Sequence, residues 1–298
     1  HAPVRTILAD VTDQTRMEGV FKKYRPDFDF HAAAYKHVPL MEQNPYVAVS
    51  VNVGGTTILT NLAVKYGVEK FVMVSTDKAV NPTNVMGASK RTCEQILRSR
   101  SSLERNKTQF VITRFGNVLG SNGSVIPIFR RQIEEGGPVT VTHPDITRYF
   151  MTIPEACQLV LEAGFMGSGG EIFVFDMGEP VKIYDLAKEL IRLSGFEPEE
   201  DIEIKFTGLR PGEKLYEELL IQGEGIMPTS HKKIRVAKAN MVDWDLLCQQ
   251  LEKLYEASHT YDLETVKTLL REIVPEYQPA DHSKLAPVSS DAKVVPIR

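Results

Sequence analysis

The feature that most constrains this chain is an apolar run that turns at once into reactive polar side chains. Phe71–Val74 is apolar throughout, in the pattern of a buried parallel strand, and the sequence Ser-Thr-Asp-Lys follows it. Thr76, Asp77 and Lys78 therefore stand at the carboxyl end of a predicted strand. In open α/β sheets, ligands bind beyond the carboxyl ends of the strands. The sequence thus predicts a binding site at this place.

A predicted helix follows this strand and adds two more candidate residues. Asn81-Pro82 makes a turn, and the helical pattern after it holds Met86 and Lys90. Residues four apart on a helix share one face, so these two side chains are expected to point the same way. The candidate catalytic residues are Thr76, Asp77, Lys78, Met86 and Lys90.

The composition is that of an ordinary globular protein and excludes some classes of function. Of 298 residues, 42% are hydrophobic and 25% are charged, and the net charge is −4. This balance offers no basic field for nucleic acid, so we expect no nucleic-acid partner. The three cysteines show no metal or redox spacing, so we expect reduced structural thiols and no metal. No apolar run approaches the ~18 residues of a membrane span, and no signal peptide opens the chain.

Short apolar runs and helical patterns alternate along most of the chain, which indicates an α/β fold with a parallel sheet. The other predicted strands are residues 4–8, 28–31, 109–114, 139–142, 171–175 and 202–206. The other predicted helices are residues 13–23, 44–66, 124–135, 153–164, 183–194, 242–258 and 263–273.

The sequence Ser-Thr-Asp-Lys-Ala, followed by Asn-Pro-Thr-Asn-Val-Met-Gly-Ala-Ser-Lys, resembles the active-site segment of the extended short-chain dehydrogenase/reductase family. Within that family it is similar to the nucleotide-sugar 4,6-dehydratases, and the resemblance runs from about Val4 to Pro275. The family's usual Tyr-x-x-x-Lys pair is replaced here by Met86-x-x-x-Lys90. This replacement is typical of the large membrane-anchored dehydratases of bacterial polysaccharide and glycan biosynthesis.

The resemblance implies a Rossmann-type doubly wound parallel sheet with a small C-terminal α/β substrate lobe. Residues 1–138 would form a partial NAD-binding domain, and residues 139–275 mainly a nucleotide-sugar lobe with some return to the core. Residues 276–298 are polar and are predicted to be a disordered tail. In the family, residues 4–8 would be the third strand. The two strand–helix units before it and the glycine-rich turn have no counterpart, so we expect a sequence that omits its ~70–80 N-terminal residues.

The reaction implied by the resemblance converts a UDP-N-acetylhexosamine, expected to be UDP-N-acetylglucosamine, to its 4-keto-6-deoxy product. C4 is oxidised, water is eliminated across C5 and C6, and hydride returns to C6, with NAD as the hydride carrier. The elimination needs an acid and a base side by side, and Asp77 and Lys78 can fill the two roles. By resemblance Lys78 is the base and Asp77 the acid, which requires one pKa to be raised and the other lowered.

The remaining residues of this segment have supporting roles. Met86 carries a thioether, which can neither take nor give a proton, so it is expected to pack. Thr76 can hydrogen-bond the sugar 4-hydroxyl, whose proton is expected to pass to Asp77 or to a bound water. By resemblance, Lys90 binds the nicotinamide ribose and supplies positive charge.

Further cofactor residues follow from the resemblance. Asp10 and Val11 would meet the adenine, Lys36 would reach the dinucleotide phosphates, and Asn52 would lie near the cofactor. The chain then has three small residues, Ala32, Ala33 and Ala34. They allow either a close approach of the backbone to a ligand or tight helix–sheet packing.

Four residues are assigned to the substrate by the same resemblance. Asn117 would lie at the sugar. Arg148 and Arg210 would clamp the diphosphate, because guanidinium is a natural bidentate partner of phosphate oxygens. Glu213 closes the Arg-x-Gly-Glu element that begins at Arg210.

Two other interpretations remain open at this level. An epimerase or reductase of the same family would share the fold, but C4 epimerisation needs no acid–base pair such as Asp77-Lys78. A catalytically silent protein that binds sugar nucleotides would account for the missing Tyr and the missing glycine-rich turn. We also expect a homo-oligomer in the cytoplasm, or on the cytoplasmic face of the inner membrane through a segment outside this chain.

Overall fold

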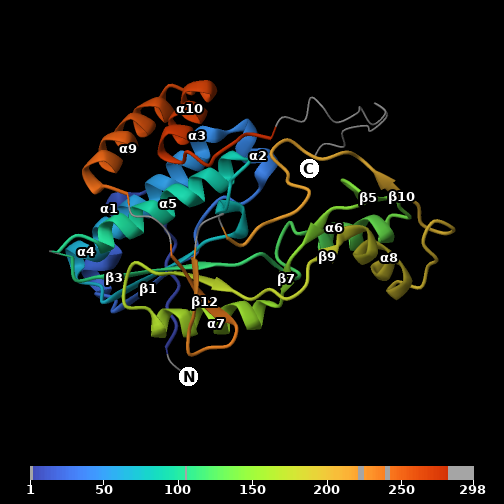
Figure 1. Ribbon diagram of the computed structural model, residues 1–298, viewed down its shortest axis with the longest axis horizontal. Helices are drawn as coiled ribbons and strands as arrows, with labels where there is room; N and C mark the ends of the chain where they lie inside the picture. The colour runs from blue at the N-terminus through green and yellow to red at the C-terminus, as the bar shows by residue number, and fades with distance from the viewer. Residues whose placement is uncertain (1–2, 105, 221–224, 239–241, 281–298) are drawn as a thin grey trace.

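A six-stranded sheet lies at the centre of the computed structural model, which describes residues 3–104, 106–220, 225–238 and 242–280 (Figure 1). In spatial order the strands are β1 (Phe28–His31), β2 (Lys70–Val74), β3 (Gln109–Arg114), β8 (Ile172–Phe175), β12 (Ile234–Lys238) and β11 (Gly225–Pro228). The first four are parallel, whereas β12 runs antiparallel to β8 and β11 antiparallel to β12. The predicted α/β fold with a parallel sheet is confirmed, and the antiparallel pair at its edge is absent from the sequence prediction.

Helices cover both faces of this sheet. They are α1 (Gln14–Tyr24), α2 (Val38–Gln43), α4 (Gly55–Tyr66), α5 (Val85–Ser101), α7 (Ile153–Met166), α9 (Trp244–His259) and α10 (Leu263–Ile273). Alternate residues of β2 point to opposite faces: Phe71 and Met73 belong to the core on the α5 side, and Val72 to the core on the α7 side. Figure 1 shows α5, α9 and α10 on one side of the sheet and α7 on the other. This two-sided cover explains why β2 is apolar at every position after Lys70.

The helix predicted from Asn44 to Tyr66 is one continuous element with a change of pitch. It begins as α3 (Pro45–Val47), widens into a π-helix (Ala48–Gly54) and continues as α4. Gly67 ends it in the left-handed conformation, with φ 71°, as predicted. In the described part of the chain it is the one helix long and apolar enough, by length and composition, to cross a membrane. This corrects the expectation that no stretch approaches such a length; 56% of the apolar window is buried, which a core helix also shows.

The N-terminal segment departs from the prediction. Residues 4–8, expected as a strand, form none in the structure, and Val4 and Leu8 are 90% and 94% exposed. A strand needs a hydrogen-bonded neighbour, and among the described residues the sheet ends at β1 without including this segment. Asp13 does cap α1 as predicted, by accepting a hydrogen bond from Arg16 N.

A smaller lobe extends beyond the carboxyl ends of the parallel strands (Figure 1). Its apolar core comes from α6 (Val125–Glu134), α8 (Ile183–Leu193), β5 (Val139–Val141) and β10 (Ile204–Phe206). β5 and β10 pair in parallel, and α6 and α8 pack beside β5. Two short ladders lie where the lobe meets the body, namely β4 (Asn117–Val118) with β7 (Phe150–Met151), and β6 (Thr147–Arg148) with β9 (Val181–Lys182).

The C-terminal part of the chain returns to the main body. α9 and α10 pack on each other and against α5. Residues 276–280 continue this packing, since Tyr277 is 2% exposed within the core and Gln278 N donates to Pro82 O at 3.0 Å. The disordered tail predicted from residue 276 is therefore wrong for residues 276–280, because the Tyr277 side chain is part of the apolar core. The rest of the predicted tail, residues 281–298, lies outside the described residues.

Candidate active site

β2 delivers Thr76, Asp77 and Lys78 to the carboxyl edge of the sheet. Asp77 N still donates to Phe115 O at 3.0 Å, just beyond the end of β3. The chain then makes one 3₁₀ turn, Asp77–Ala79, which Thr76 caps by accepting at Oγ1 from Lys78 N at 3.3 Å. Backbone hydrogen bonds therefore fix all three residues at the place where the sequence predicts a ligand.

Asp77 and Lys78 form an ion pair at this edge. Asp77 is fully buried, and its Oδ1 accepts hydrogen bonds from Lys78 Nζ at 3.0 Å and from Thr76 Oγ1 at 2.8 Å. Lys78 Nζ also donates to Asn117 Oδ1, on β4, at 3.1 Å. Four residues that the sequence predicts for catalysis and substrate binding are thus joined in one hydrogen-bonded group.

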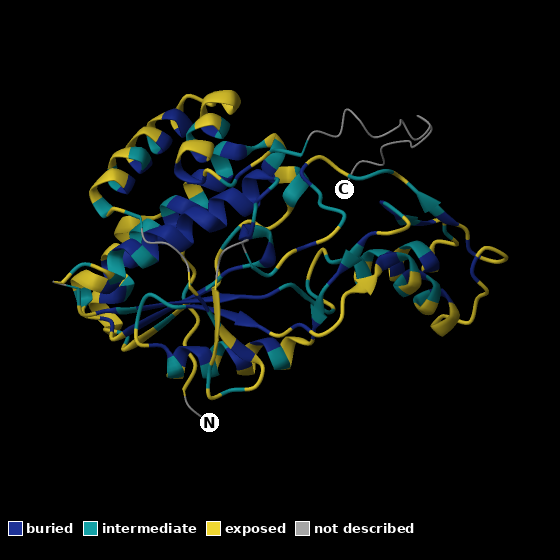
Figure 2. Ribbon diagram, viewed as in Figure 1, coloured by how far each residue is buried: buried dark blue, intermediate teal, exposed yellow. Residues whose placement is uncertain are grey.

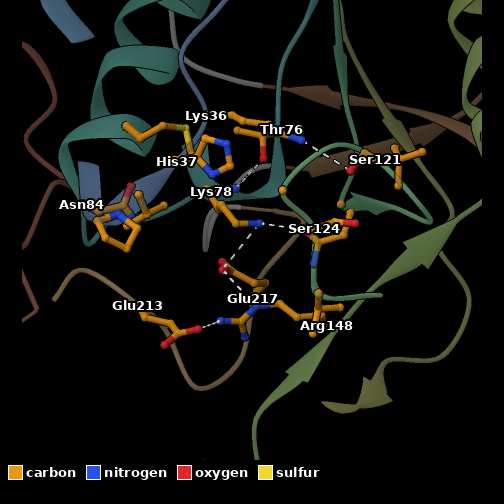
Figure 3. A pocket seen from close by; sticks show the side chains of 18 of the residues that line it. Lys36, His37, Thr76, Lys78, Asn84, Ser121, Ser124, Arg148, Glu213 and Glu217 are labelled. Carbon is orange, nitrogen blue, oxygen red and sulfur yellow. Dashed lines mark hydrogen bonds and ion pairs between the residues drawn. The ribbon is translucent and has the colours of Figure 1, made fainter. Parts of the chain in front are cut away.

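A fifth residue, Glu217, completes this group and is absent from the sequence prediction. Its Oε1 lies 3.8 Å from Lys78 Nζ and 3.8 Å from Arg148 Nε, and Figure 3 shows it between the two cations. It is 8% exposed. Glu217 follows the Arg-x-Gly-Glu element in a segment without helix or strand, so no periodicity distinguishes it from Glu213 or Glu218.

The charges of this group set its protonation state. Burial alone would lower the pKa of Lys78, but the nearby carboxylates of Asp77 and Glu217 outweigh burial and raise it. Burial raises the pKa of Glu217, and Asp77 adds to this, although Lys78 acts in the opposite direction. Lys78 is therefore an ammonium in this arrangement. The lowered pKa that a Lys78 base requires is not what the structure gives.

The next side of the site is α5, which carries Met86 and Lys90 on one face, as predicted. Asn84 caps this helix by accepting from Gly87 N at 2.7 Å. Gly87 permits the close approach of α5 to the catalytic segment, since a Cβ there would lie 2.1 Å from Lys78 O. Burial lowers the pKa of Lys90.

A cavity of about 470 Å³ lies between the body and the lobe and is open to these side chains (Figure 3). Predicted residues that line it are Ala32, Ala34, Lys36, Thr76, Lys78, Met86, Lys90, Asn117, Arg148, Arg210 and Glu213. The structure therefore brings most of the predicted cofactor, catalytic and substrate residues to one cavity. Its volume lies within the range of ordinary small-molecule sites.

The other predicted residues lie outside the lining. Asp77 is fully buried and contacts Lys78, which does line the cavity, at 3.0 Å. Asn52 supports the wall, because its side chain bonds both Tyr35 N (2.8 Å) and Tyr35 O (3.1 Å) in the loop after β1. Asp10 accepts hydrogen bonds from Thr12 in its own turn. Ala33 is exposed, and Val11 is half-buried against the core.

The two predicted clamp arginines have different surroundings. Arg148 is 7% exposed and is held by Thr147 O at 2.7 Å, Leu215 O at 3.3 Å and Glu213 Oε1 at 3.3 Å. Arg210 is exposed, and its backbone N donates to Glu213 Oε2 at 3.1 Å. Glu213 therefore bonds both arginines. Both line the cavity, but the Arg210 side chain is exposed whereas the Arg148 side chain is buried.

These features define a Rossmann-type protein with a polar acid–base group at the carboxyl edge of its sheet. Residues 1–239 match the family described as polysaccharide biosynthesis protein, and the chain belongs to this family of extended short-chain dehydrogenases/reductases. It is 55% identical over 256 residues to a probable polysaccharide biosynthesis protein, EpsC, of Bacillus subtilis, covering 86% of this chain and 42% of the relative. The chain thus spans less than half the length of that relative.

Several relatives carry names for particular reactions, an epimerase and a dehydratase among them. A UDP-glucose 4-epimerase of Rickettsia canadensis is 42% identical over 65% of this chain and 56% of its own length. The inverting UDP-N-acetylglucosamine 4,6-dehydratase of Campylobacter jejuni is 36% identical over 72% of this chain and 61% of its own length. Among solved structures, Pen from Bacillus thuringiensis has a TM-score of 0.73 and 35% identity, covering 80% of this chain and 74% of that one.

Proposed function

We propose that this chain carries the catalytic site of an NAD-dependent nucleotide-sugar 4,6-dehydratase acting on a UDP-N-acetylhexosamine, with UDP-N-acetylglucosamine as the expected substrate. The observation that carries the proposal is the Asp77–Lys78 pair, 3.0 Å apart, at the edge of the cavity. An elimination across C5 and C6 needs two proton-transfer groups side by side, and this pair supplies them. The 36% identity to a protein named for this reaction supports it.

The residues present fit the nicotinamide end of a dinucleotide. Ala32 and Ala34 line the cavity, which leaves room for a ligand, and Lys90 adds a buried amine on the same wall. These residues, with Lys36, would hold NAD, and Asn52 would keep the loop after β1 in place. Bound NAD supplies the hydride acceptor for C4 and the hydride donor for C6. Asp10 and Val11 remain the proposed adenine contacts.

The substrate would lie across the lobe side of the cavity. Thr76 Oγ1 would bond the 4-hydroxyl and pass its proton to Asp77, whose Oδ1 it already contacts at 2.8 Å. Protonated Asp77 would then be the acid that releases the 6-hydroxyl as water. Lys78 would be the base at C5, and Asn117 would hold its Nζ in place at 3.1 Å. Met86 packs against this site and transfers no proton.

The wider assignments are proposals as well. Residues 1–138 would carry the cofactor site and residues 139–275 mainly the substrate site, with Arg210 and Arg148 on the diphosphate side. The nucleotide sugar is the proposed partner, in a homo-oligomer. We place the activity in the cytoplasm or on the cytoplasmic face of the inner membrane.

Incubating the intact protein with UDP-N-acetylglucosamine tests the proposal. We expect a 4-keto-6-deoxy sugar nucleotide, detected by mass spectrometry as a loss of one water and by nuclear magnetic resonance at C6. A 4-epimerase, which the 42% identity to a protein of that name favours, would give the galacto epimer without loss of water. If the protein binds the UDP-sugar but forms no new product, it is a catalytically silent binding protein.

A further inference from the structure

The charge state of Lys78 leaves the chemistry of the proposed site incomplete. A base at C5 must be neutral before it takes a proton, yet Lys78 is an ammonium beside Asp77 and Glu217. One of its protons must therefore move to another group before the elimination begins. The groups that the structure places around Nζ are Asp77, Asn117 and Glu217.

Two of these three groups cannot hold the proton. The side-chain amide of Asn117 is an acceptor of hydrogen bonds but is not a base in this pH range. Asp77 already receives the proton of the 4-hydroxyl and must keep it for the departing 6-hydroxyl. A second proton on the same carboxyl has no place, so Glu217 is the group that remains.

We propose that Glu217 takes the proton that Lys78 sheds, so that Asp77, Lys78 and Glu217 act as one three-residue proton-transfer group. This inference rests on the proposed dehydratase function. Glu217 acts through Lys78 and is therefore a positioning residue rather than a group that touches the sugar.

The geometry of Glu217 fits this task. Its Oε1 stands 3.8 Å from Lys78 Nζ, a distance that a small side-chain rotation converts into a hydrogen bond. Its Oε2 is buried and has no hydrogen-bond partner among the described residues, so the carboxyl has an oxygen in reserve. Figure 3 shows the carboxyl between Lys78 and Arg148 at the cavity wall. A buried polar atom left without a partner calls for an explanation, and proton storage supplies one.

The segment around Glu217 is anchored, so its backbone keeps the carboxyl near Lys78. Lys214 Nζ donates to Val80 O at 2.9 Å, next to the catalytic turn. Thr83 Oγ1 and Asn84 Nδ2 donate to Gly212 O at 3.0 Å and 2.9 Å. Glu217 is thus fixed against the same strand end that carries Lys78.

Charged groups from each neighbouring element face Glu217. Burial and Asp77, from the strand end, favour the protonated carboxyl. Lys78 from the same strand end, Arg148 from β6 and Lys214 from its own segment favour the carboxylate. The balance raises the pKa of Glu217. Arg148 also pairs with Glu213, at 3.3 Å from Nη2 to Oε1, which limits how far Arg148 lowers the pKa of Glu217.

Each proton transfer balances. The Lys78 ammonium gives one proton to the Glu217 carboxylate, which leaves an amine and a carboxyl. The amine lone pair takes the C5 proton, and the C5–H electron pair moves to the 4-keto oxygen as an enolate. The enolate expels the 6-hydroxyl, which leaves as water with the proton of Asp77. When C6 is reduced, Lys78 returns its proton to C5, and Glu217 then restores the ammonium.

Glu217→Gln in the intact protein tests this role, with Glu218→Gln as the matched control. Glu218 is the adjacent residue, is exposed, and pairs with Lys214 at 3.1 Å outside the cavity lining. With UDP-N-acetylglucosamine, Glu217→Gln should still form NADH in the first half-reaction. Product formation and C5 exchange in deuterated water should fall about 10²- to 10⁴-fold at every pH tested, as for a lost acid–base group. Glu218→Gln should match the parent protein.

Other outcomes overturn the inference. If Glu217 only tunes Lys78, removing its charge lowers the pKa of Lys78. The acidic limb of the rate profile then moves to lower pH while the maximal rate is kept. If NADH formation is lost together with C5 exchange, Glu217 is a structural residue. If the parent protein itself forms no 4-keto-6-deoxy product, the proposed function fails instead.

Infrared titration of the unliganded protein is a second readout that needs neither substrate nor cofactor. A protonated-carboxyl band should persist above the ordinary range of Glu and be absent from Glu217→Gln. In Lys78→Met the same band should persist to still higher pH, because the cation that favours the carboxylate is gone. A band that is unchanged in Lys78→Met would show that the two groups share no proton and would overturn the inference.

Discussion

Asp77 and Lys78 are neighbours in the chain, yet their side chains meet on one side of it. Adjacent residues on a strand point to opposite faces. The single 3₁₀ turn after β2 breaks this alternation, and it brings Lys78 Nζ within 3.0 Å of Asp77 Oδ1. The turn therefore converts a strand end into an acid–base pair. Asn117 and Glu217, from distant parts of the chain, then hold Lys78 from the other side.

Lys78→Met in the intact protein should separate oxidation from elimination. The variant keeps the stem but loses the amine, so NADH absorbance should build up while the 4-keto-6-deoxy product is absent. In deuterated water the stalled 4-keto sugar should show little exchange at C5. The expected loss is about 10²- to 10⁴-fold in product formation, measured by quenched-flow mass spectrometry.

Asp77→Asn is the partner experiment and should behave differently. Thr76 must then pass the 4-hydroxyl proton to a bound water, so NADH should form more slowly. Because the base remains, the 4-keto sugar that does form should still exchange at C5 while its loss of water slows. The reverse pattern, in which Asp77→Asn stops exchange and Lys78→Met preserves it, would exchange the acid and the base between the two residues. Turnover of Lys78→Met near the parental rate would remove Lys78 from the chemistry.

Arg210 and Arg148 should differ when each is replaced by alanine. Arg210→Ala removes an exposed side chain, so UDP affinity should fall about 10- to 100-fold, the value of a charged hydrogen bond, with stability unchanged. Arg148→Ala leaves Glu213 and Glu217 without their shared cation, so it should also cost about 3–5 kcal/mol of stability.

Calorimetry with UDP and thermal melts of the intact protein measure both effects. Arg192→Ala, on the exposed face of α8, is the control and should change neither quantity. Unaltered UDP affinity in both cavity variants would remove the diphosphate clamp from the proposal.

At the scale of elements, α5 is the helix around which the body packs. Every residue from Val85 to Leu97 is buried, and Figure 2 shows the helix enclosed by more exposed elements. Some of its buried polar side chains bond the elements packed on it, since Gln95 Nε2 donates to Ile273 O at 3.0 Å and Ser99 Oγ to Val242 O at 2.9 Å. This packing holds Met86 and Lys90 against the cavity, because the helix has no free side on which to move.

Gly87→Ala should destabilise the protein although alanine favours helices. The new Cβ would meet Lys78 O at 2.1 Å, and backbone cannot yield as a side chain can. Helix propensity offers about 1 kcal/mol in favour of alanine, but overpacking typically costs about 1–3 kcal/mol or more, so destabilisation should win. Product formation should fall as well, since Lys78 would shift.

Gly19→Ala, in α1, is the matched control for this change. A Cβ at Gly19 meets nothing within 4 Å, so this variant should gain about 0.5–1 kcal/mol. Chemical denaturation of the two variants beside the parent protein measures the difference. Equal stability changes would mean that α5 can move away from the catalytic turn.

Local signals decide which elements the sequence can predict. α10 lies where it is predicted, at Leu263–Ile273, because Asp262 caps an amphipathic stretch. Residues 4–8 have the pattern of a strand, but pairing depends on a neighbour and not on the segment itself. β11 is exposed at all four positions, so it shows no alternation to detect. Glu217 enters the site only through long-range packing, which leaves no mark on its neighbours in the sequence.

At the scale of the whole molecule, one buried carboxylate ties the sheet, α5 and the C-terminal segment together. Glu94, on α5, accepts hydrogen bonds from Ser75 Oγ at 2.7 Å and from Arg114 Nη2, on β3, at 2.7 Å. Arg91 Nη1 donates to it at 3.0 Å, and Arg91 Nε donates to Glu276 beyond α10 at 2.8 Å. The strand end that carries the catalytic turn is thus anchored from behind.

This network should make stability depend on acid. Burial alone would raise the pKa of Glu94, but Arg114 and Arg91 outweigh it and lower the pKa from 4.5 to about 2. A carboxylate with a depressed folded-state pKa stabilises the protein above its unfolded pKa, and this contribution is lost as pH falls from about 4.5 towards 2. The shift corresponds to roughly 3 kcal/mol at neutral pH.

Glu94→Gln should therefore flatten the stability curve between pH 4.5 and pH 2 and lower stability at pH 7, since it removes a buried carboxylate that pairs with Arg114 and Arg91. Urea denaturation at stepped pH measures both effects. Glu189→Gln, an exposed change on α8, should leave the curve as in the parent protein. If the stability of Glu94→Gln still depends on pH as in the parent protein, another group is responsible for the acid dependence. The anchor behind the catalytic turn would then rest on hydrogen bonds rather than on charge.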